Sequence, residues 1–365
     1  MARVVLAMSG GVDSSVAAWL LRRQGHEVIG LFVRHGQAAL ESTCATPNES
    51  QDLDHLHKQG CCSAADAADA RRVADKLEIP FYVVNFEEQF GRIVDYFVAE
   101  YTAGRTPNPC IVCNTWLKFG KLFDYADSVG AEFVATGHYA RLLPAGADEP
   151  ALCRGVDPGK DQSYVLFGVA RNQLRRMLLP VGDYHKDQIR AMAAEAGLRV
   201  AGKPDSQEIC FVPDQDHAGF IRRRREPCDT SGQIVTTDGA VVGRHDGLEQ
   251  FTIGQRKGLG LAFGEPRYVV RLEAATRQVV IGTKQELGRL ELTAREANWL
   301  TAPPTQALEC AVKIRYRSRP LPSTVEPLAA NRFRVRFHEP CEGVAPGQAA
   351  VCYQADRVLG GGWIE

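Results

Sequence analysis

Strand-like and helix-like stretches alternate through the first part of the chain, and this alternation restricts the fold more than any other feature of the sequence. Apolar runs of strand length occupy residues 4–8, 26–33, 81–84 and 131–136, and helical periodicity occupies residues 13–23, 63–77 and 114–128. Ser63 favours a helix start because a short polar side chain caps the first turn, and Asp66 follows inside that turn. Strands that alternate with helices predict an α/β fold, with a parallel sheet covered by helices on both faces.

The character of the sequence changes after residue 202. A chain of 365 residues is too long for one ordinary core. Residues 203–280 are rich in Gly and Arg, and from residue 281 short alternating runs are separated by Pro and Gly, a pattern typical of a small all-β barrel or sandwich. We therefore predict an α/β domain over 1–202, a small central α+β domain over 203–280 and a C-terminal β-barrel over 281–365. Residues 34–62 are polar and without period, as in long functional loops.

The composition is that of a globular protein in a reducing compartment. Hydrophobic residues make up 45% of the chain, but no apolar run approaches the roughly 20 residues that a membrane helix needs. The sequence enters a strand pattern at once, without a secretory leader, so we predict a cytoplasmic protein that does not engage a membrane. The 11 cysteines are odd in number and scattered, which favours thiols over disulfides. A net charge of −1 does not exclude nucleic acid, because positive side chains cluster at Arg222–Arg225 and at Lys313, Arg315, Arg317 and Arg319.

A glycine-rich loop, Ser9–Ser15, lies between the first predicted strand and the first predicted helix. Its glycines let backbone N–H groups turn towards a phosphate, and the helix N-terminus adds positive potential. The loop lacks the Lys that grips the β and γ phosphates in GxxxxGK[ST] loops. It therefore favours cleavage at the α phosphate of ATP, which releases AMP and pyrophosphate, and Asp13 is expected to contact Mg²⁺ there. The alternative is an ordinary strand-to-helix turn. The motif resembles the PP-loop of the N-type ATP pyrophosphatases, which have an adenine nucleotide α-hydrolase-like fold.

Two groups of cysteines are candidates for chemistry. Cys110 and Cys113 precede a predicted helix, whose N-terminus lowers a thiol pKa and raises the thiolate fraction. Cys210 follows the change in domain character, so only folding can bring it near Cys113. Most cysteines are expected to be small buried hydrophobes. A zinc site or an iron–sulfur cluster that combines Cys110 and Cys113 with Cys61–Cys62 is the less favoured alternative.

The motifs together resemble one family, the bacterial and organellar tRNA-specific 2-thiouridylases, almost from end to end. The matching segments are SGGVDSS at residues 9–15, GLFV at 30–33, CCS at 61–63, TPNPC at 106–110, CN at 113–114, KF at 118–119, ATGHYAR at 135–141, KDQSY at 160–164, SQEICF at 206–211, GQRKGLG at 254–260, KIRYR at 313–317 and PGQ at 346–348.

This resemblance implies roles for individual residues. Cys210 would carry a persulfide received from a cysteine desulfurase or a sulfur-relay protein, and Cys113 would be the nucleophile that releases this sulfur and ends in a disulfide with Cys210. Asn108, Pro109 and Cys110 would lie against the target base. The residues that would bind ATP are Ala7, Met8, Ser9, Gly10, Gly11, Val12, Asp13, Ser14, Val33 and Gly137. The residues that would contact tRNA are His138, Lys160, Asp161, Gln162, Arg315, Tyr316 and Gln348.

The reaction that these roles imply is chemically reasonable for a uracil base. The C2 oxygen of uracil is a poor leaving group, but transfer of AMP to it creates a good one that a sulfur nucleophile displaces. A single-stranded base at the wobble position of the anticodon stem-loop enters such a pocket more cheaply than a paired base. Arginine-rich clusters would hold phosphates, although a solvated charged face is the alternative for Arg222–Arg225.

Two positions depart from the family pattern, and two rival functions stay open. Cys110 stands where many members have Asp, and Val33 stands where Met is frequent. One rival is another PP-loop enzyme, such as an amidotransferase-type synthetase, a tRNA lysidine synthetase or a cytidine 2-thiolase. The other rival is a non-catalytic persulfide carrier or tRNA-binding module, which the intact phosphate loop disfavours.

Overall fold

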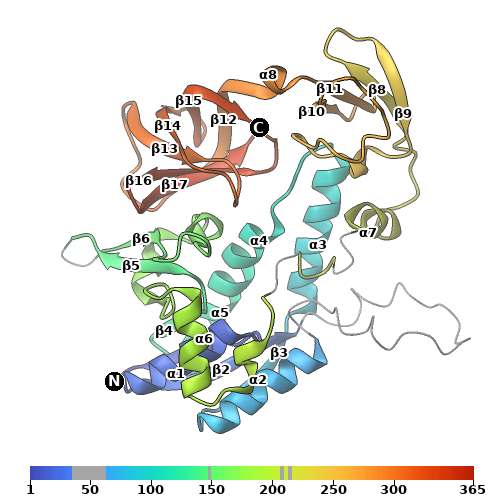
Figure 1. Cartoon of the computed structure of the whole chain (residues 1–365). Helices are drawn as coiled ribbons and strands as arrows, with labels where there is room; N and C mark the ends of the chain where they lie inside the picture. Colours follow the sequence, from blue (N-terminus) through green and yellow to red (C-terminus); the bar gives the residue numbers. More distant parts are fainter. Residues whose placement is uncertain (35–62, 147–148, 206–208, 213–215) are drawn as a thin grey trace, which may run out of the picture. The chain divides into compact units, whose positions relative to one another are not determined.

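The structure is a computed structural model that describes residues 1–34, 63–146, 149–205, 209–212 and 216–365. The chain divides into two compact units (Figure 1). Unit 1 comprises Met1–Ile93, Cys110–Gln215 and Asp356–Val358, and unit 2 comprises Val94–Pro109, Asp216–Ala355 and Leu359–Glu365. Residues 94–109 thus join the C-terminal half, an association that the sequence analysis did not predict. The three predicted domain boundaries stay predictions.

Unit 1 is built on a five-stranded parallel sheet in the order β3-β2-β1-β4-β7. The strands are β1 (Arg3–Ala7), β2 (Glu27–Arg34), β3 (Phe81–Asn85), β4 (Phe133–Ala135) and β7 (Met177–Leu178). Val4, Val5 and Leu6 of the central strand are fully buried, as expected for a strand covered on both faces. The predicted α/β fold is confirmed.

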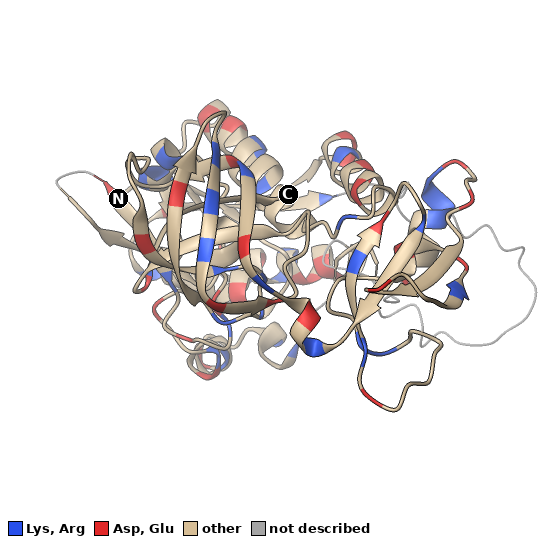
Figure 2. Ribbon diagram, turned by 90° about the horizontal axis from the view of Figure 1, so that it is seen from above, with Lys and Arg blue, Asp and Glu red and all other residues tan. Residues whose placement is uncertain are grey.

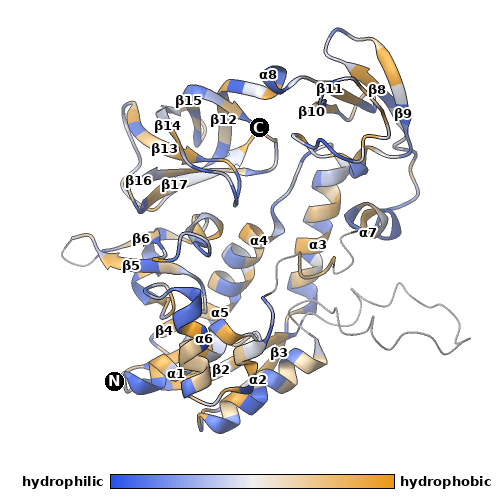
Figure 3. Ribbon diagram, viewed as in Figure 1, coloured by the Kyte–Doolittle hydropathy of each residue, from blue (hydrophilic) through white to orange (hydrophobic). Residues whose placement is uncertain are grey.

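Helices of unit 1 pack against this sheet. α1 (Val12–Arg23) and α2 (Ala64–Lys76) contact β1 to β3, and α5 (Leu122–Ser128) contacts β1 and β4. The predicted cap is confirmed, because the Ser63 hydroxyl accepts from the Asp66 N–H at 3.1 Å and the Asp66 carboxylate accepts from the Ser63 N–H at 3.2 Å. Figure 3 shows hydrophilic and hydrophobic residues alternating along α2.

The helix expected over residues 114–128 begins earlier and is not uniform. α4 (Pro109–Val112) starts it, and Pro is favoured at a first helical position because it has no N–H to satisfy. A π-helical segment, η3 (Cys113–Lys121), then leads into α5. Phe119 in this segment has φ −109° and ψ 15°, outside helical values. π turns are frequent at functional sites, and hydrophobic periodicity does not reveal them.

Unit 1 also contains a pair of antiparallel strands and several short helices. β5 and β6 pair antiparallel, and the Asp356 carbonyl accepts from the Arg154 N–H at 2.9 Å. These elements are β5 (Ala140–Pro144), β6 (Pro150–Arg154), η4 (Ser163–Leu166), η5 (Arg171–Arg176), α6 (Lys186–Glu195) and η6 (Arg199–Gly202). Helix α3 (Glu87–Thr102) passes from unit 1 into unit 2.

Unit 2 contains a four-stranded sheet in the order β10-β11-β8-β9, in which only β11 and β8 are parallel. Its elements are α7 (His217–Arg224), β8 (Gly232–Thr236), β9 (Val241–His245), η7 (Leu248–Gln250), β10 (Tyr268–Glu273), β11 (Gln278–Gly282) and α8 (Lys284–Leu287). This arrangement confirms the predicted central α+β region.

The C-terminal part of unit 2 is a closed six-stranded barrel, as predicted. Its order is β12-β15-β14-β13-β16-β17, and antiparallel pairing of β12 with β17 closes it. The strands are β12 (Gly288–Trp299), β13 (Leu308–Lys313), β14 (Leu321–Leu328), β15 (Arg332–Glu342), β16 (Ala349–Gln354) and β17 (Arg357–Ile364). Val325, Phe333 and Val335 are fully buried in its core. Figure 2 shows basic and acidic residues interspersed along the barrel strands, where Arg336 pairs with Glu291 and Glu326.

None of the helices that the structure describes is both long enough and apolar enough to cross a membrane.

Candidate functional site

The Ser9–Ser15 loop connects β1 to α1 and leaves the helix N-terminus open. The residue at the helix cap is Gly11, which has no side chain to bond the first N–H groups of α1. The Ser15 hydroxyl donates to the Gly11 carbonyl at 2.8 Å, and the Ser9 N–H donates to the Ser14 hydroxyl oxygen at 3.2 Å. The loop is therefore ordered by its own serines, and backbone donors at the start of α1 remain suited to an anion.

Two glycines allow this loop to pack closely. Gly10 has φ +73°, and an added Cβ would lie 2.2 Å from the Asp66 carbonyl oxygen. A Cβ at Gly137 would lie 2.7 Å from the Ser14 nitrogen. Ala7 pairs with Leu31, two residues before Val33 on β2. The structure thus brings the predicted ATP-binding residues of β1, β2, the loop and Gly137 to the carboxyl ends of the strands, where α/β folds bind ligands.

A buried lysine that the sequence analysis missed holds Asp13. Lys186, the first residue of α6, donates from Nζ to the two Asp13 carboxylate oxygens at 2.7 and 2.9 Å and pairs with Asp205 at 2.8 Å. The Tyr139 hydroxyl also donates to Asp13, at 2.6 Å. Burial, followed by the Asp13 charge, raises the pKa of Tyr139, so the phenol keeps its proton.

A second lysine ties the segment after residue 202 to the loop. Lys203 Nζ donates to the Gly10 carbonyl at 3.0 Å and to the carboxylates of Asp66 and Asp69 at 2.7 Å each. Burial alone would lower the pKa of Lys203, but hydrogen bonds to these carboxylates raise it above its ordinary value. The local sequence around Lys203 predicts only a change of domain, because it does not show which residues its charged side chains pair with.

Asp205 collects three cations from unit 1. Lys160 lies 2.7 Å from it, Lys186 2.8 Å and Arg190 3.0 Å. Burial raises the pKa of Asp205, but the hydrogen bonds from Lys160 and Lys186 outweigh it and hold that pKa below its ordinary value. Lys160, predicted to contact tRNA, therefore also has a structural partner.

The predicted thiols lie on well-defined segments of unit 1. Cys110 in α4 is exposed, whereas Cys113, which begins the π-helical segment, is half-buried. Its neighbour Asn114 is buried and donates to the Val165 carbonyl at 3.2 Å. Cys210 is half-buried, and the adjacent Phe211 packs edge-on against Phe90 with ring centroids 5.6 Å apart. The roles of the two thiols stay predictions.

The metal-cluster alternative involves Cys61 and Cys62, which lie outside the described residues. Across the described ranges, no group of three or more His, Cys, Asp and Glu side chains is arranged to hold a metal ion.

The tRNA contacts predicted in unit 1 are largely buried. His138 bonds through Nδ1 to the Thr136 hydroxyl at 2.7 Å, and burial, with a smaller effect of Lys118, lowers the pKa of His138 well below its ordinary value. Its imidazole is therefore neutral. Asp161 accepts from the Gly155 and Ser163 N–H groups at 3.3 and 3.0 Å. Gln162 accepts from the Tyr139 N–H at 2.9 Å.

The tRNA contacts predicted in unit 2 differ in exposure. Tyr316 is 37% exposed, and Lys313 Nζ lies 5.8 Å from the centre of its ring. Arg315 donates to the Ile253 carbonyl at 2.7 Å. Gln348 is buried. The side chains of Arg315 and Gln348 thus have bonding partners within the protein, and their contacts to RNA stay predictions.

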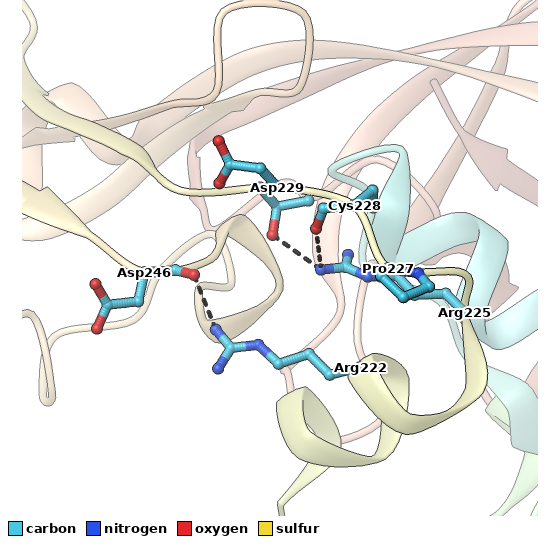
Figure 4. A pocket seen from close by; sticks show the side chains of 7 residues that line it. Arg222, Arg225, Pro227, Cys228, Asp229 and Asp246 are labelled. Carbon is cyan, nitrogen blue, oxygen red and sulfur yellow. Dashed lines mark hydrogen bonds between the residues drawn. The ribbon is translucent and has the colours of Figure 1, made fainter.

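A pocket of about 450 Å³ lies in unit 2, and its lining includes Arg222 and Arg225 of the predicted basic cluster. Figure 4 shows Arg222 donating to the Asp246 carbonyl and Arg225 donating to the Cys228 carbonyl. Glu249, only 1% exposed, accepts from Arg222 Nε at 2.7 Å. Burial raises the pKa of Glu249, but hydrogen bonds from Arg222 and then Thr230 keep it below its ordinary value. Two of the arginines expected either to hold phosphate or to be solvated, Arg222 and Arg225, thus neutralise a buried carboxylate.

Comparison with known proteins gives matches along the whole chain. A family model described as the tRNA methyl transferase HUP domain matches residues 2–214, a tRNA methyl transferase PRC-barrel domain matches 218–283, and an aminomethyltransferase β-barrel domain matches 289–364. The tRNA-specific 2-thiouridylase MnmA of Rhodopirellula baltica is 54% identical, over 100% of this chain and 96% of the relative. The proteins of the same name from Geotalea uraniireducens and Carboxydothermus hydrogenoformans are 51% and 46% identical, over 100% of this chain and 95% and 97% of theirs.

Proposed function

The chain belongs to the tRNA-specific 2-thiouridylase family, and we propose that it replaces the C2 oxygen of the wobble uridine of tRNA with sulfur at the expense of ATP. The observation that carries this proposal is the open N-terminus of α1 behind a two-glycine loop, together with two thiols on segments of the same unit. The family is one of transferases that modify tRNA.

ATP binding would use the phosphate loop. The α1 N-terminus offers backbone N–H groups to the phosphates, and the close packing of Gly137 on Ser14 forms one wall of the site. Mg²⁺, when bound, would neutralise phosphate charge, and the partly exposed Asp13 carboxylate is an oxygen ligand of the type that it prefers. Lys186 and Lys203 pair with the carboxylates beside the loop, and this neutralises negative charge that would otherwise repel the phosphates.

The chemistry has two stages. The C2 oxygen of the uracil attacks the α phosphorus of ATP, and pyrophosphate leaves. The outer sulfur of a Cys210 persulfide then bonds to C2, while the Cys113 thiolate attacks the inner sulfur. The S–S electron pair goes to the transferred sulfur, AMP leaves with the oxygen, and Cys113 and Cys210 form a disulfide. A thiol reductant restores the pair for the next cycle.

The roles on either side of the base follow from this scheme. Asn108, Pro109 and Cys110 would face the uracil, and Tyr316 offers an exposed ring at the RNA-binding surface. Cys110 supplies a thiol where many relatives have a carboxylate, so base positioning here relies on Asn108 and on the backbone. The sulfur enters from a cysteine desulfurase or a relay protein.

The test measures AMP release and base thiolation separately. The chain is incubated with ATP, Mg²⁺, unmodified tRNA, cysteine and a cysteine desulfurase, and mass spectrometry of the anticodon nucleoside detects sulfur in place of oxygen. Cys113→Ser and Cys210→Ser should each abolish thiolation, and tRNA-dependent AMP formation should persist. Cys228→Ser, an exposed cysteine outside the site, is the matched control and should keep full activity.

Two outcomes favour the rivals. Full thiolation by either Cys113→Ser or Cys210→Ser would overturn the persulfide scheme, whereas AMP release without uridine thiolation by the unaltered chain would point to another adenylating PP-loop enzyme. Absence of tRNA-dependent AMP release from the unaltered chain would instead favour a carrier or binding module.

A further inference from the structure

Gln348 holds the loop that carries the target-base residues. It precedes β16 in the barrel, is 8% exposed, and donates from Nε2 to the Thr106 carbonyl at 3.0 Å and to the Pro107 carbonyl at 3.2 Å. All of these residues belong to unit 2. An amide NH₂ has two hydrogens, so both are used on two successive backbone carbonyls.

The backbone next to Gln348 adds to this attachment. The Thr106 N–H donates to the Pro346 carbonyl at 2.8 Å. Gly347 has φ +89°, and an added Cβ would lie 3.0 Å from the Thr106 carbonyl oxygen, so a side chain there would press on the loop. The segment itself is fixed to the barrel, because the Gly347 N–H donates to the Ile364 carbonyl at 3.0 Å and the Ile364 N–H donates to the Gln348 carbonyl at 2.8 Å.

The residue that directly precedes the loop is held by an ion pair. Arg105 donates from Nε to Glu100 at 2.7 Å and from Nη2 to the second carboxylate oxygen, and Glu100 is only 7% exposed. A bidentate pair of this kind fixes direction as well as distance. The backbone that leads into Asn108 and Pro109 is therefore held at Arg105 by α3 and at Thr106 and Pro107 by the barrel.

We propose that Gln348 is a positioning residue for the thiolation reaction, which acts on the base through Thr106, Pro107 and the adjoining Asn108 and Pro109 rather than by donating a hydrogen bond to RNA. The inference rests on the proposed function. Its physical basis is that both Nε2 hydrogens are already donated, while a displacement of about 1 Å in a substrate-positioning group is enough to cost roughly a hundredfold in rate.

The first test replaces Gln348 by an apolar residue of similar size. Gln348→Leu leaves the two carbonyls without their donor and should lower kcat for tRNA thiolation by roughly 10- to 100-fold, while the Kd for tRNA changes less than about twofold. Gln354→Leu, an exposed glutamine at the end of β16, is the matched control and should leave both values unchanged.

A second variant disturbs the same loop without removing a polar group. Gly347→Ala adds only a methyl, which must displace the Thr106 carbonyl. It should lower kcat in the same way, and the double variant should lose less than the product of the two single effects, because both act on one loop.

Hydrogen exchange separates this proposal from the function on which it rests. Peptides covering residues 103–110 should exchange faster in Gln348→Leu and in Gly347→Ala, and peptides covering β1 and α1 should not change. This measurement needs no activity, so it decides whether Gln348 holds the loop even if the chain thiolates no RNA. Unchanged exchange at residues 103–110, or a raised Kd with unaltered kcat, would overturn the positioning role.

Discussion

The phosphate loop of unit 1 and the Thr106–Pro109 loop of unit 2 are both fixed by residues distant in sequence, but by different kinds of bond. Charged pairs hold the first, since Lys186 binds Asp13 and Lys203 binds the Gly10 carbonyl together with two carboxylates. Within the second loop, the Thr106 and Pro107 carbonyls are held by neutral hydrogen bonds from Gln348, and the Arg105–Glu100 ion pair lies just before this loop. Charged pairs respond to pH, to salt and to an arriving anion, whereas neutral bonds respond only to geometry. This difference fits the two proposed roles, the binding of ATP by the first loop and the orientation of a base by the second.

The largest effect is expected at the charged region. Lys186→Ala leaves Asp13 and Asp205 without a buried cation and should lower AMP formation by about 100-fold or more. It should also lower the free energy of unfolding by about 2 kcal/mol, less than for a fully buried pair because both carboxylates are partly exposed. Urea unfolding and AMP release measure the two effects. Lys121→Ala, an exposed lysine paired with exposed Asp124, is the control and should cost less than about 0.5 kcal/mol.

Salt should sharpen the contrast between the two regions. Lys203→Met should destabilise the chain by about 1 kcal/mol in 0.1 M salt and by less in 1 M salt, because the screening length falls from about 10 Å to about 3 Å. Gln348→Leu should cost about 2 kcal/mol at both salt concentrations, since it leaves uncharged carbonyls unsatisfied. If the loss of unfolding free energy changed equally with salt in the two variants, the proposed difference between charged and neutral attachment would be wrong.

A smaller effect is expected with pH. Because the pKa of Asp205 is below its ordinary value of 3.8 in the folded chain, its carboxylate stabilises the fold above that value, and this contribution is lost as the pH falls through the folded pKa. The difference in unfolding free energy between the wild type and Asp205→Asn should therefore be constant from pH 5 to 8 and shrink below about pH 4. The corresponding difference for Gln348→Leu should not show this step.

The smallest effect concerns His138. Burial lowers its pKa well below the ordinary 6.5, so the ring should stay neutral from pH 6 to 8. NMR should show no titration of the His138 ring protons across this range. A midpoint near 6.5 would mean that water reaches the ring.

Sequence alone predicted those features that depend on neighbours along the chain. Val4, Val5 and Leu6 form an uninterrupted apolar run and became a central strand. Ser63 and Asp66 lie three residues apart and formed the expected cap. The Ser9–Ser15 loop followed from its place between a strand and a helix, and the barrel followed from alternation in short runs.

The missed features depend on pairs that are distant in sequence. Lys186 and Asp13 are separated by 173 positions, and Gln348 and Thr106 by 242. No local pattern distinguishes a lysine that will be buried against a carboxylate from one on a solvated helix. The π-helical segment at Cys113 was missed for a different reason. Over a segment this short, the spacing of apolar residues in a π-helix cannot be distinguished from that in an α-helix.

The closure of β12 on β17 has a further consequence for recognition. Every strand of the described barrel has a neighbour on each side, and the start of β17, which β12 does not pair, is bonded to β6 at Arg357, so the barrel presents no long row of unsatisfied backbone donors and acceptors. A peptide cannot extend it by strand addition, and two copies cannot fuse edge to edge there. Any ligand that the barrel recognises must read its turns and side chains, among which the exposed ring of Tyr316 is prominent.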